Sequence, residues 1–376
     1  MLFHGLADSL ADKRAELLFD NKNGGYACPA LSRLKLDMGV TDKNMNKGLI
    51  FLEPVFKEMI WGGSRLASEF GYEIPGDDTG ECWGISAHPN GDCTVACGKY
   101  AGKKLSQLWS ECPELFGRER PEGIFPLLTK IIDARADLSI QVHPSDSYAK
   151  VNENGSLGKT ECWYILDCPE NAKLVVGHNA RDKKECAEMI HEGRWSEFIR
   201  EVPVHKGDFV SIVPGTVHAI KAGVMLLETQ QNSDITYRVY DYDRLSKGKK
   251  RELHVEKSID VINAPAALAE DCIKSFAVVE KNMPVLMEKS AYYRVWKLVV
   301  ALEGAFECDS SEGALKPLKL SMEDDFDSSY LLVSVISGNG SINGVAIKKG
   351  EHFIVAHGQD ELSFEGDMEL IISAEV

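Results

Sequence analysis

The sequence lacks a hydrophobic run of the length that a membrane-spanning helix requires. No window in its 376 residues holds the roughly eighteen consecutive apolar residues of such a helix, so we expect no membrane partner. Positive charge is also scarce, because 42 lysines and arginines stand against 58 aspartates and glutamates, for a net charge of −16. A chain this acidic binds a nucleic acid backbone poorly, so we expect no nucleic acid partner. A small phosphorylated substrate is still permitted, since a few basic residues can make one pocket positive.

Paired cysteines of the kind that hold structural zinc are absent. The ten cysteines are scattered, and none forms a Cys-x-x-Cys pair. No signal peptide is visible. We therefore expect reduced cysteines and a cytoplasmic location.

The length of the chain and its pattern of short apolar runs predict two domains rich in β-structure. At 376 residues the chain exceeds the usual size of a single core. The first part has one helix-like stretch, Ala7–Phe19, and is otherwise loop-like. From Leu49 onward, short β-rich runs closed by Gly, Pro, Asn or Asp alternate with helical stretches at Lys104–Phe116 and Arg181–Val202. This alternation is typical of a jelly roll with inserted helices.

Three short segments carry residues that suit a divalent metal ion. Asp137–Pro144 reads as a strand, and its alternation puts Gln141 and His143 on one face with apolar residues on the other. Glu161 opens a second apolar run, and His218 follows a third. Any one histidine is more often a surface or core residue than a ligand, so the hypothesis depends on the set. Two imidazoles and two side-chain oxygens suit an ion such as Zn²⁺, with space left for a substrate, and indicate a metalloenzyme.

Several ordered motifs surround these residues. They lie at Leu52–Gly63, Leu127–Asp133, Leu138–Pro144, Gly158–Tyr164, Val213–Ala219 and Glu228–Arg238. Together they resemble the type I phosphomannose isomerases in their short bacterial form, over roughly residues 49–376. The resemblance implies an enzyme that interconverts mannose 6-phosphate and fructose 6-phosphate on a cupin fold. It also implies one bound zinc ion per chain, with Gln141, His143, Glu161 and His218 as its ligands.

The implied fold is mainly β, with two cupin-like jelly rolls and inserted helices. Strands predicted at Tyr292–Ala301 and Tyr330–Ile336 belong to the second roll. Aligning Gly350 with Gly207 places Glu361 at the position of His218, so the second roll is predicted to lack a metal site. The predicted domains are a poorly ordered extension at 1–47, a catalytic cupin domain with helical insertions at 48–264 and a cupin-like β domain at 265–376.

An aldose–ketose isomerase needs a base that moves a proton between adjacent carbons, and an anchor for the phosphate. Lys159 lies two residues before Glu161, so a strand would place both on one face. The resemblance makes Arg238 a residue that holds the phosphate or supports the enediolate, and Glu228 a candidate base. Without the resemblance, solvated lysines and a structural ion pair between Glu228 and Arg238 stay open, and the identity of the base is not settled. The catalytic candidates are Arg238, Glu228, Lys159, Lys130 and Asp234.

Three other interpretations of the function compete with this one. The chain could be a noncatalytic sugar-binding cupin or an isomerase for another sugar phosphate. An oxygenase is disfavoured, because such sites use histidines and a carboxylate rather than a Gln-x-His pair. The expected partner is a small sugar phosphate, and the expected assembly is a monomer or a homodimer.

Two assignments concern charged residues outside the predicted site. The charge run Lys247–Arg251 reads as an exposed loop, and His352 and His357 are assigned to surface or loop positions.

Overall fold

The computed structural model describes residues 48–120, 123–246, 248–301 and 317–376. These residues belong to one compact unit. The helix predicted at Ala7–Phe19 lies outside the described residues. Within the described part, no helix combines the length and the apolar character needed to cross a bilayer.

Two sheets surround the predicted metal ligands. The seven-stranded sheet has the order β18 (Ile273–Ser275), β12 (Asp208–Ile212), β9 (Glu161–Asp167), β14 (Met225–Gln231), β7 (Leu127–Asp133), β3 (Thr79–Ile85) and β2 (Val55–Gly63). The five-stranded sheet has the order β11 (Ile199–Pro203), β10 (Lys173–His178), β13 (His218–Ala219), β8 (Ile140–Val142) and β15 (Tyr237–Tyr240). Apolar side chains from both sheets, among them Trp163, Val176 and Leu226, form one core between them.

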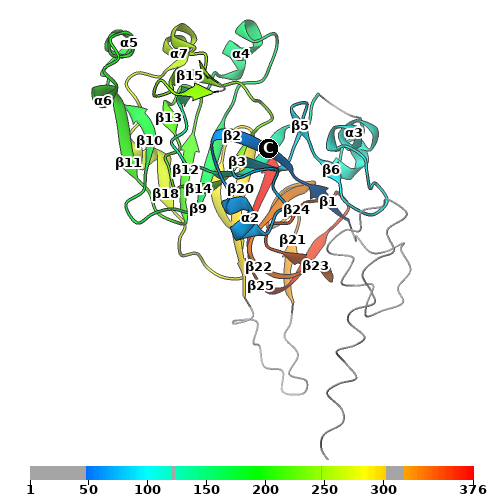
Figure 1. The fold of residues 1–376 in the computed structure, drawn as a ribbon. Coiled ribbons are helices and arrows are strands. Elements are labelled where there is room, and N and C mark those ends of the chain that lie inside the picture. The colour runs from blue at the N-terminus through cyan, green and yellow to red at the C-terminus, as the bar shows by residue number, and fades with distance from the viewer. Residues whose placement is uncertain (1–47, 121–122, 247, 302–316) are drawn as a thin grey trace, which may run out of the picture. The chain divides into compact units, whose positions relative to one another are not determined.

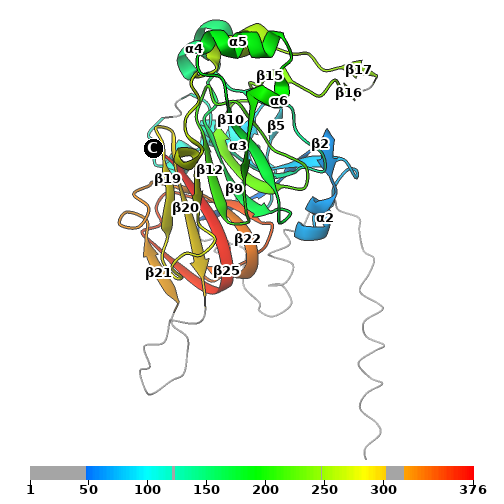
Figure 2. The ribbon, with the colours of Figure 1, turned by 90° about the vertical axis from the view of Figure 1, so that its left-hand side faces the viewer.

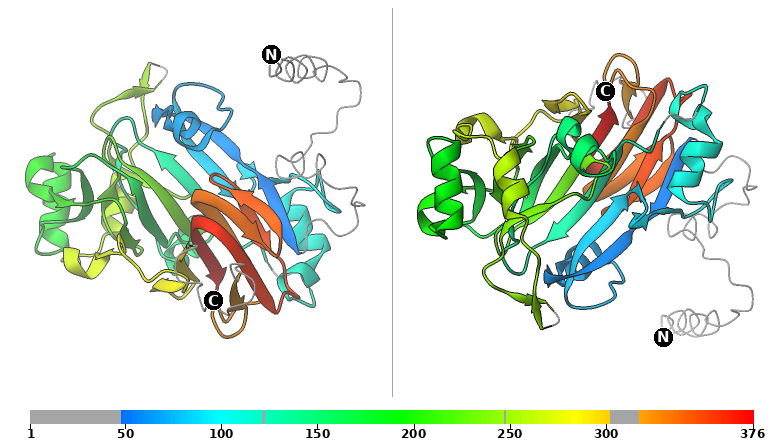
Figure 3. Two further views of the ribbon diagram at one scale, coloured as in Figure 1. Left: turned by 90° about the horizontal axis from the view of Figure 1, so that it is seen from below. Right: turned by 90° about the horizontal axis from the view of Figure 1, so that it is seen from above.

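A third sheet is built largely from the C-terminal part of the chain. Its order is β19 (Val285–Lys289), β20 (Tyr293–Val300), β25 (Glu361–Glu375), β22 (Leu331–Ile342), β24 (His352–Val355), β1 (Leu49–Glu53) and β6 (Thr94–Val95), with β21 (Leu318–Ser321) on β25 and β23 (Val345–Lys348) on β22. The first described strand therefore lies beside C-terminal strands, and Figure 3 shows blue next to orange and red. Conversely, β18 lies after residue 264 and pairs with β12 of the seven-stranded sheet. Each of these two sheets therefore contains strands from both sides of residue 264. The domain boundaries stay a prediction.

The seven-stranded sheet is covered on both faces. One face contacts the five-stranded sheet, and the other packs residues such as Ile131, Tyr164 and Leu227 against Val295 and Ile371 of the third sheet. All seven residues of β3, β7 and β14 are buried for this reason. A strand that is covered on both faces exposes neither set of its side chains to water, so it does not need alternating polar and apolar residues.

Short helices and hairpins complete the fold. Figure 1 shows α4, α5 and α7 gathered at one end of the strands, and Figure 2 shows the β16–β17 hairpin projecting outward. Helices α5, α6 and α7 supply Met189, Ile190, Phe198 and Ile259 to a core on the outer face of the five-stranded sheet. The helices are α2 (Arg65–Phe70), α3 (Leu105–Glu111), η2 (Pro113–Phe116), α4 (Asp146–Asn152), α5 (Lys183–His191), α6 (Trp195–Phe198), α7 (Val255–Val261) and α8 (Ala269–Cys272), and the hairpin strands are β4 (Ala87–His88), β5 (Gly91–Asp92), β16 (Leu245–Ser246) and β17 (Lys249–Lys250).

Most of the predicted elements form, with two corrections. The helical stretch Arg181–Val202 does break at Gly193, but its last residues form β11, because Ile199–Pro203 pairs with β10. The surface assignment of His352 is wrong, since this residue is 1% exposed within β24. Its partners Ser334 and Tyr72 lie far away in the sequence. His357 is exposed in a loop, as predicted.

Candidate metal centre

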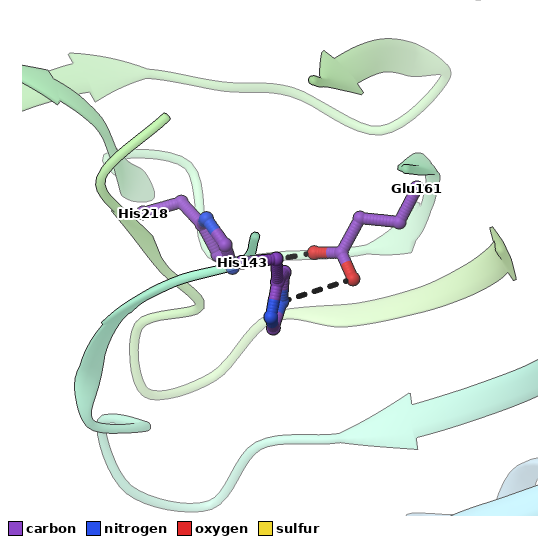
Figure 4. Close-up of side chains that lie close together, drawn as sticks. All are labelled: His143, Glu161 and His218. Carbon is purple, nitrogen blue, oxygen red and sulfur yellow. Dashed lines mark ion pairs between the residues drawn. The ribbon is translucent and has the colours of Figure 1, made fainter. Parts of the chain in front are cut away.

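Three strand ends bring His143, Glu161 and His218 together (Figure 4). His143 follows β8, Glu161 opens β9 and His218 opens β13. The first and last of these strands are neighbours in the five-stranded sheet, while β9 lies in the seven-stranded sheet. All three side chains are buried, and their ligand atoms lie within 4.8 Å of one another. The strands thus place two imidazoles and a carboxylate in a geometry that could hold a metal ion.

A tight turn after β12 positions His218. The N–H of Gly215 donates to the carbonyl of His143 at 2.9 Å, so the turn is tied to the strand that carries the other histidine. Gly215 has a φ of +85°, a left-handed conformation that glycine adopts without strain. The chain then enters β13, where His218 pairs with Gln141.

Backbone carbonyls set the tautomer of both imidazoles. Nδ1 of His143 lies 2.8 Å from the carbonyl of Ile235, and Nδ1 of His218 lies 2.9 Å from the carbonyl of Thr216. A carbonyl only accepts, so each Nδ1 carries the proton and each Nε2 presents a lone pair.

These lone pairs face another acceptor. The Nε2 atoms of His143 and His218 each lie 3.3 Å from a carboxylate oxygen of Glu161. Nε2 of His218 is buried and has no hydrogen-bond partner among the described residues. The Lys159 ammonium contacts Glu161 and lies 3.3 Å from Nε2 of His143, but it provides no hydrogen bond to Nε2 of His218. A lone pair that faces a carboxylate oxygen in this way is repelled unless a cation lies between them, so the set fits a divalent metal ion.

The charge states of the three residues also suit a metal. Burial lowers the pKa of His218 to about 3 and lowers the pKa of His143, so both imidazoles are neutral near pH 7. Burial alone would raise the pKa of Glu161, but Lys159 and the two histidines hold this pKa well below its ordinary value. Neutral imidazoles and an ionised carboxylate are the forms that coordinate a divalent ion.

The strand register adds Gln141 and Arg238 to the same region. Gln141 pairs with His218 on one side and with Arg238 on the other. Residues paired across antiparallel strands project to the same face, so the three side chains form a row over β13, β8 and β15. Gln141 and Arg238 line a cavity of about 300 Å³ whose wall also includes Glu161.

A buried cluster of lysines and glutamates adjoins the metal residues. The Lys159 ammonium contacts Glu161, and its Nζ lies 3.1 Å from Oε1 of Glu228. Nζ of Lys130 lies 3.5 Å from the same Glu228 oxygen and 3.8 Å from Oε2 of Glu81. Burial, with a contribution from the nearby Glu161 carboxylate, raises the pKa of Glu228 to about 7. All five groups line the cavity.

Every predicted site residue lies in or beside this cavity, and the structure adds Arg251. Asp234 lies at the exposed edge, where it accepts a hydrogen bond of 3.0 Å from Asn90. Arg251 was assigned to an exposed loop, and that prediction is wrong. Its side chain is 19% exposed and lines the cavity, because Asp241 holds its Nε at 2.7 Å. Only the acid at Asp241 could have signalled this, and its pairing with Arg251 depends on the fold.

Comparison with known proteins identifies the family. The model for the type I phosphomannose isomerase catalytic domain matches residues 49–171, and the model for the mannose-6-phosphate isomerase cupin domain matches residues 315–375. The mannose-6-phosphate isomerase ManA of Bacillus subtilis is 46% identical, over 86% of this chain and 98% of its own length. The chain belongs to the type I phosphomannose isomerases. The mannose-6-phosphate isomerase of Streptococcus mutans is 42% identical, over 86% of this chain and 97% of its own length.

Solved structures agree with this family. The crystal structure of the mannose 6-phosphate isomerase from Bacillus subtilis matches with a TM-score of 0.74 and 42% identity, over 87% of this chain and 99% of that one. The apo form of the Salmonella typhimurium enzyme has the same fold, with a TM-score of 0.64 at 14% identity over 87% of this chain and 99% of that one. The predicted resemblance and the mainly β, cupin-type fold are thus confirmed. Type I phosphomannose isomerases are metal-dependent aldose–ketose isomerases, and His143, Glu161 and His218 form a possible metal site in this member.

Proposed function

We propose that this member of the family interconverts D-mannose 6-phosphate and D-fructose 6-phosphate in the cytoplasm, with one zinc ion per chain. The observation that carries the proposal is the convergence of two imidazole lone pairs and the Glu161 carboxylate beside a cavity lined with lysines and arginines. Nitrogen and oxygen ligands of this kind suit zinc. The names of the relatives from Bacillus subtilis and Streptococcus mutans support the substrate.

Gln141 is proposed as the fourth ligand. Its pairing with His218 puts its side chain on the face that carries the metal residues, and it lines the cavity. A side-chain amide oxygen is a neutral ligand, so the four residues together carry one negative charge. A divalent ion bound there keeps a net positive charge and supplies a Lewis acid for the developing charge on the sugar oxygens.

The side chains of the protein itself move the proton and hold the substrate. The isomerisation transfers a proton between C1 and C2 of the sugar through an enediolate. Glu228 is proposed as the base, because its carboxylate lines the cavity between Lys159 and Lys130. These two lysines hold the carboxylate in place and stabilise negative charge on the substrate. Arg238 and Asp234 complete the wall on the side of β15.

A coupled assay tests the substrate. Purified protein loaded with zinc receives mannose 6-phosphate, and fructose 6-phosphate is measured over time. Glucose 6-phosphate and ribose 5-phosphate are supplied instead of mannose 6-phosphate in parallel reactions, and the ketose product of each is measured. We expect rapid formation of fructose 6-phosphate and little conversion of the other two. Conversion of another sugar phosphate alone would support the alternative isomerase. Binding of mannose 6-phosphate without conversion would support the noncatalytic cupin.

A further inference from the structure

Three arginines surround one buried carboxylate that directly follows β15 of the five-stranded sheet, whereas the lysines of the cavity lie on β7 and just before β9 of the seven-stranded sheet. These two parts of the site are called the arginine end and the lysine end. Asp241 is 4% exposed and accepts two hydrogen bonds from Arg251, of 2.7 Å from Nε and 2.5 Å from Nη2. It also accepts a bond of 2.5 Å from Nη2 of Arg244. Arg238 lies near the same carboxylate. One negative charge thus faces three positive charges that never titrate near neutral pH.

The two ends of the site differ in charge balance. At the lysine end, Lys130 and Lys159 lie among the carboxylates of Glu81, Glu161 and Glu228, so both ammonium groups already have carboxylate partners. At the arginine end, three guanidinium groups lie near the single buried carboxylate of Asp241, and the further acids Glu252 and Asp234 are exposed. A phosphate dianion is therefore attracted to the arginine end, where one buried carboxylate leaves guanidinium charge unbalanced.

The arginine end also has hydrogen-bond donors to spare. Nε of Arg238 is buried without a hydrogen-bond partner among the described residues, while its Nη1 donates to the carbonyl of Glu252 at 2.8 Å. Arg251 presents five N–H donors, and its two hydrogen bonds to Asp241 use only two of them. Both arginines line the cavity, whereas Arg244 does not. Burial and the neighbouring charge of Arg251 lower the pKa of Arg238, in keeping with a local excess of positive charge.

We propose that Arg251 binds the phosphate group of the substrate together with Arg238, and that Asp241 fixes Arg251 for this contact. This inference rests on the proposed function, since it assumes a phosphorylated sugar in the cavity. Arg251 then determines specificity for the phosphate, and Glu228 and the metal residues act on the other end of the sugar. Two guanidinium groups can bind three phosphate oxygens with directed hydrogen bonds, which a single ammonium cannot do.

The test compares Arg251→Ala with Arg244→Ala. Both variants remove one positive charge and one partner of Asp241, but only Arg251 lines the cavity. For each zinc-loaded protein, KM and kcat for mannose 6-phosphate are measured, together with Ki for inorganic phosphate as a competitive inhibitor. Elemental analysis and thermal unfolding check that metal content and fold are unchanged.

We expect Arg251→Ala to raise KM and the phosphate Ki by about tenfold or more, with a smaller effect on kcat, because it loses a charge-assisted contact. Arg244→Ala should change both values less than about threefold, since it alters only the surrounding field. Arg251→Lys should recover only part of the loss. Values for Arg251→Ala within about twofold of wild type, or equal losses in both alanine variants, would overturn the inference.

A separate measurement distinguishes failure of this inference from failure of the proposed function. Inorganic phosphate is titrated calorimetrically into the zinc-loaded wild type and into Arg251→Lys, which retains the positive charge but not the guanidinium group. Weaker phosphate binding by the variant supports the role of Arg251 even if mannose 6-phosphate is not converted. Equal phosphate affinity overturns that role even if the wild type is an active isomerase.

Discussion

At the scale of single residues, the metal centre and the substrate wall are separate groups of side chains. His143 and His218 present lone pairs to Glu161 because backbone carbonyls hold their Nδ1 protons. Arg238 lies two strands from His218 and contacts none of the three metal residues in any hydrogen bond that the structure shows. Substitutions in the two groups should therefore have different consequences.

We predict that His218→Ala loses metal and activity together, whereas Arg238→Lys and Arg238→Ala lose activity and keep the metal. Removing an imidazole ligand lowers metal affinity directly, while an ammonium cannot reproduce the directed contacts of a guanidinium. The expected fall in kcat/KM for the arginine variants is about 10²-fold. Elemental analysis and steady-state kinetics on each variant provide the measurement. An unchanged kcat/KM in Arg238→Ala would make that residue structural.

The metal residues could be predicted from the sequence, but Arg251 and His352 could not. Gln141 and His143 are two residues apart in one predicted strand, so its alternation puts both on the same face, and the surrounding motifs indicate the family. The burial of Arg251 depends on Asp241, and that of His352 depends on Ser334 and Tyr72. A pattern within a short window of sequence does not predict contacts with residues outside that window. A charged run or an isolated histidine then reads as surface by default.

At the scale of elements, β24 is joined to its surroundings by a buried histidine. Nδ1 of His352 is hydrogen-bonded to the hydroxyl of Ser334 on β22 at 2.8 Å, and its Nε2 is hydrogen-bonded at 3.0 Å to the hydroxyl of Tyr72, which follows α2. A Cβ at Gly84 would lie 2.5 Å from the imidazole ring, so β3 approaches His352 closely only because it carries a glycine there. Three segments thus meet at one imidazole. The pairing of β1 with β24 is equally non-local, and the sequence alone did not predict it.

We predict that His352 makes the stability of the protein depend on pH. Burial lowers its pKa to about 4, below the value near 6.5 of an unfolded histidine. Above pH 6.5 the ring is neutral in both states. As the pH falls, the unfolded state takes up the proton first, so between pH 7 and pH 5 this residue should lower the free energy of unfolding by about 2 kcal/mol.

Denaturant unfolding of wild type and His352→Gln at pH 7 and pH 5 gives the free energy of unfolding of each protein at each pH. The contribution of His352 is the difference between the two proteins in how much this free energy falls from pH 7 to pH 5. His357→Gln is the matched control, because that histidine is exposed. Identical pH slopes in wild type and His352→Gln would show that the imidazole titrates normally in the folded protein.

At the scale of the whole molecule, the C-terminal sheet supports the catalytic sheets. Tyr292 donates to Asp146 at 2.7 Å, and Asp146 in turn accepts from the N–H of Gly158, just before Lys159. Nζ of Lys297 lies 2.7 Å from the hydroxyl of Tyr164 on β9. The Tyr292–Asp146 and Lys297–Tyr164 contacts join residues more than one hundred positions apart, so the two parts are expected to unfold together. The family motifs predicted both rolls, but they contain no information on these contacts.

We predict that a chain beginning at Met45 folds and isomerises as the full chain does. The sequence before it offers one short helix-like stretch and a loop-like remainder, so we expect it to bury too little apolar surface to offset the entropy of ordering it. The family match begins at residue 49. Scanning calorimetry and the coupled assay should give values within about twofold in kcat/KM and a few degrees in Tm. A clear loss of solubility, Tm or activity would show that the segment packs on the catalytic sheets.

Metal reconstitution tests the central claim most directly. The protein is stripped with a chelator and dialysed, its metal content is measured by elemental analysis, and zinc is added stepwise while conversion of mannose 6-phosphate to fructose 6-phosphate is followed. We predict no activity in the stripped protein and a linear recovery that saturates at one zinc ion per chain, with no recovery in His218→Ala. Full activity in protein shown to be free of metal would contradict the account.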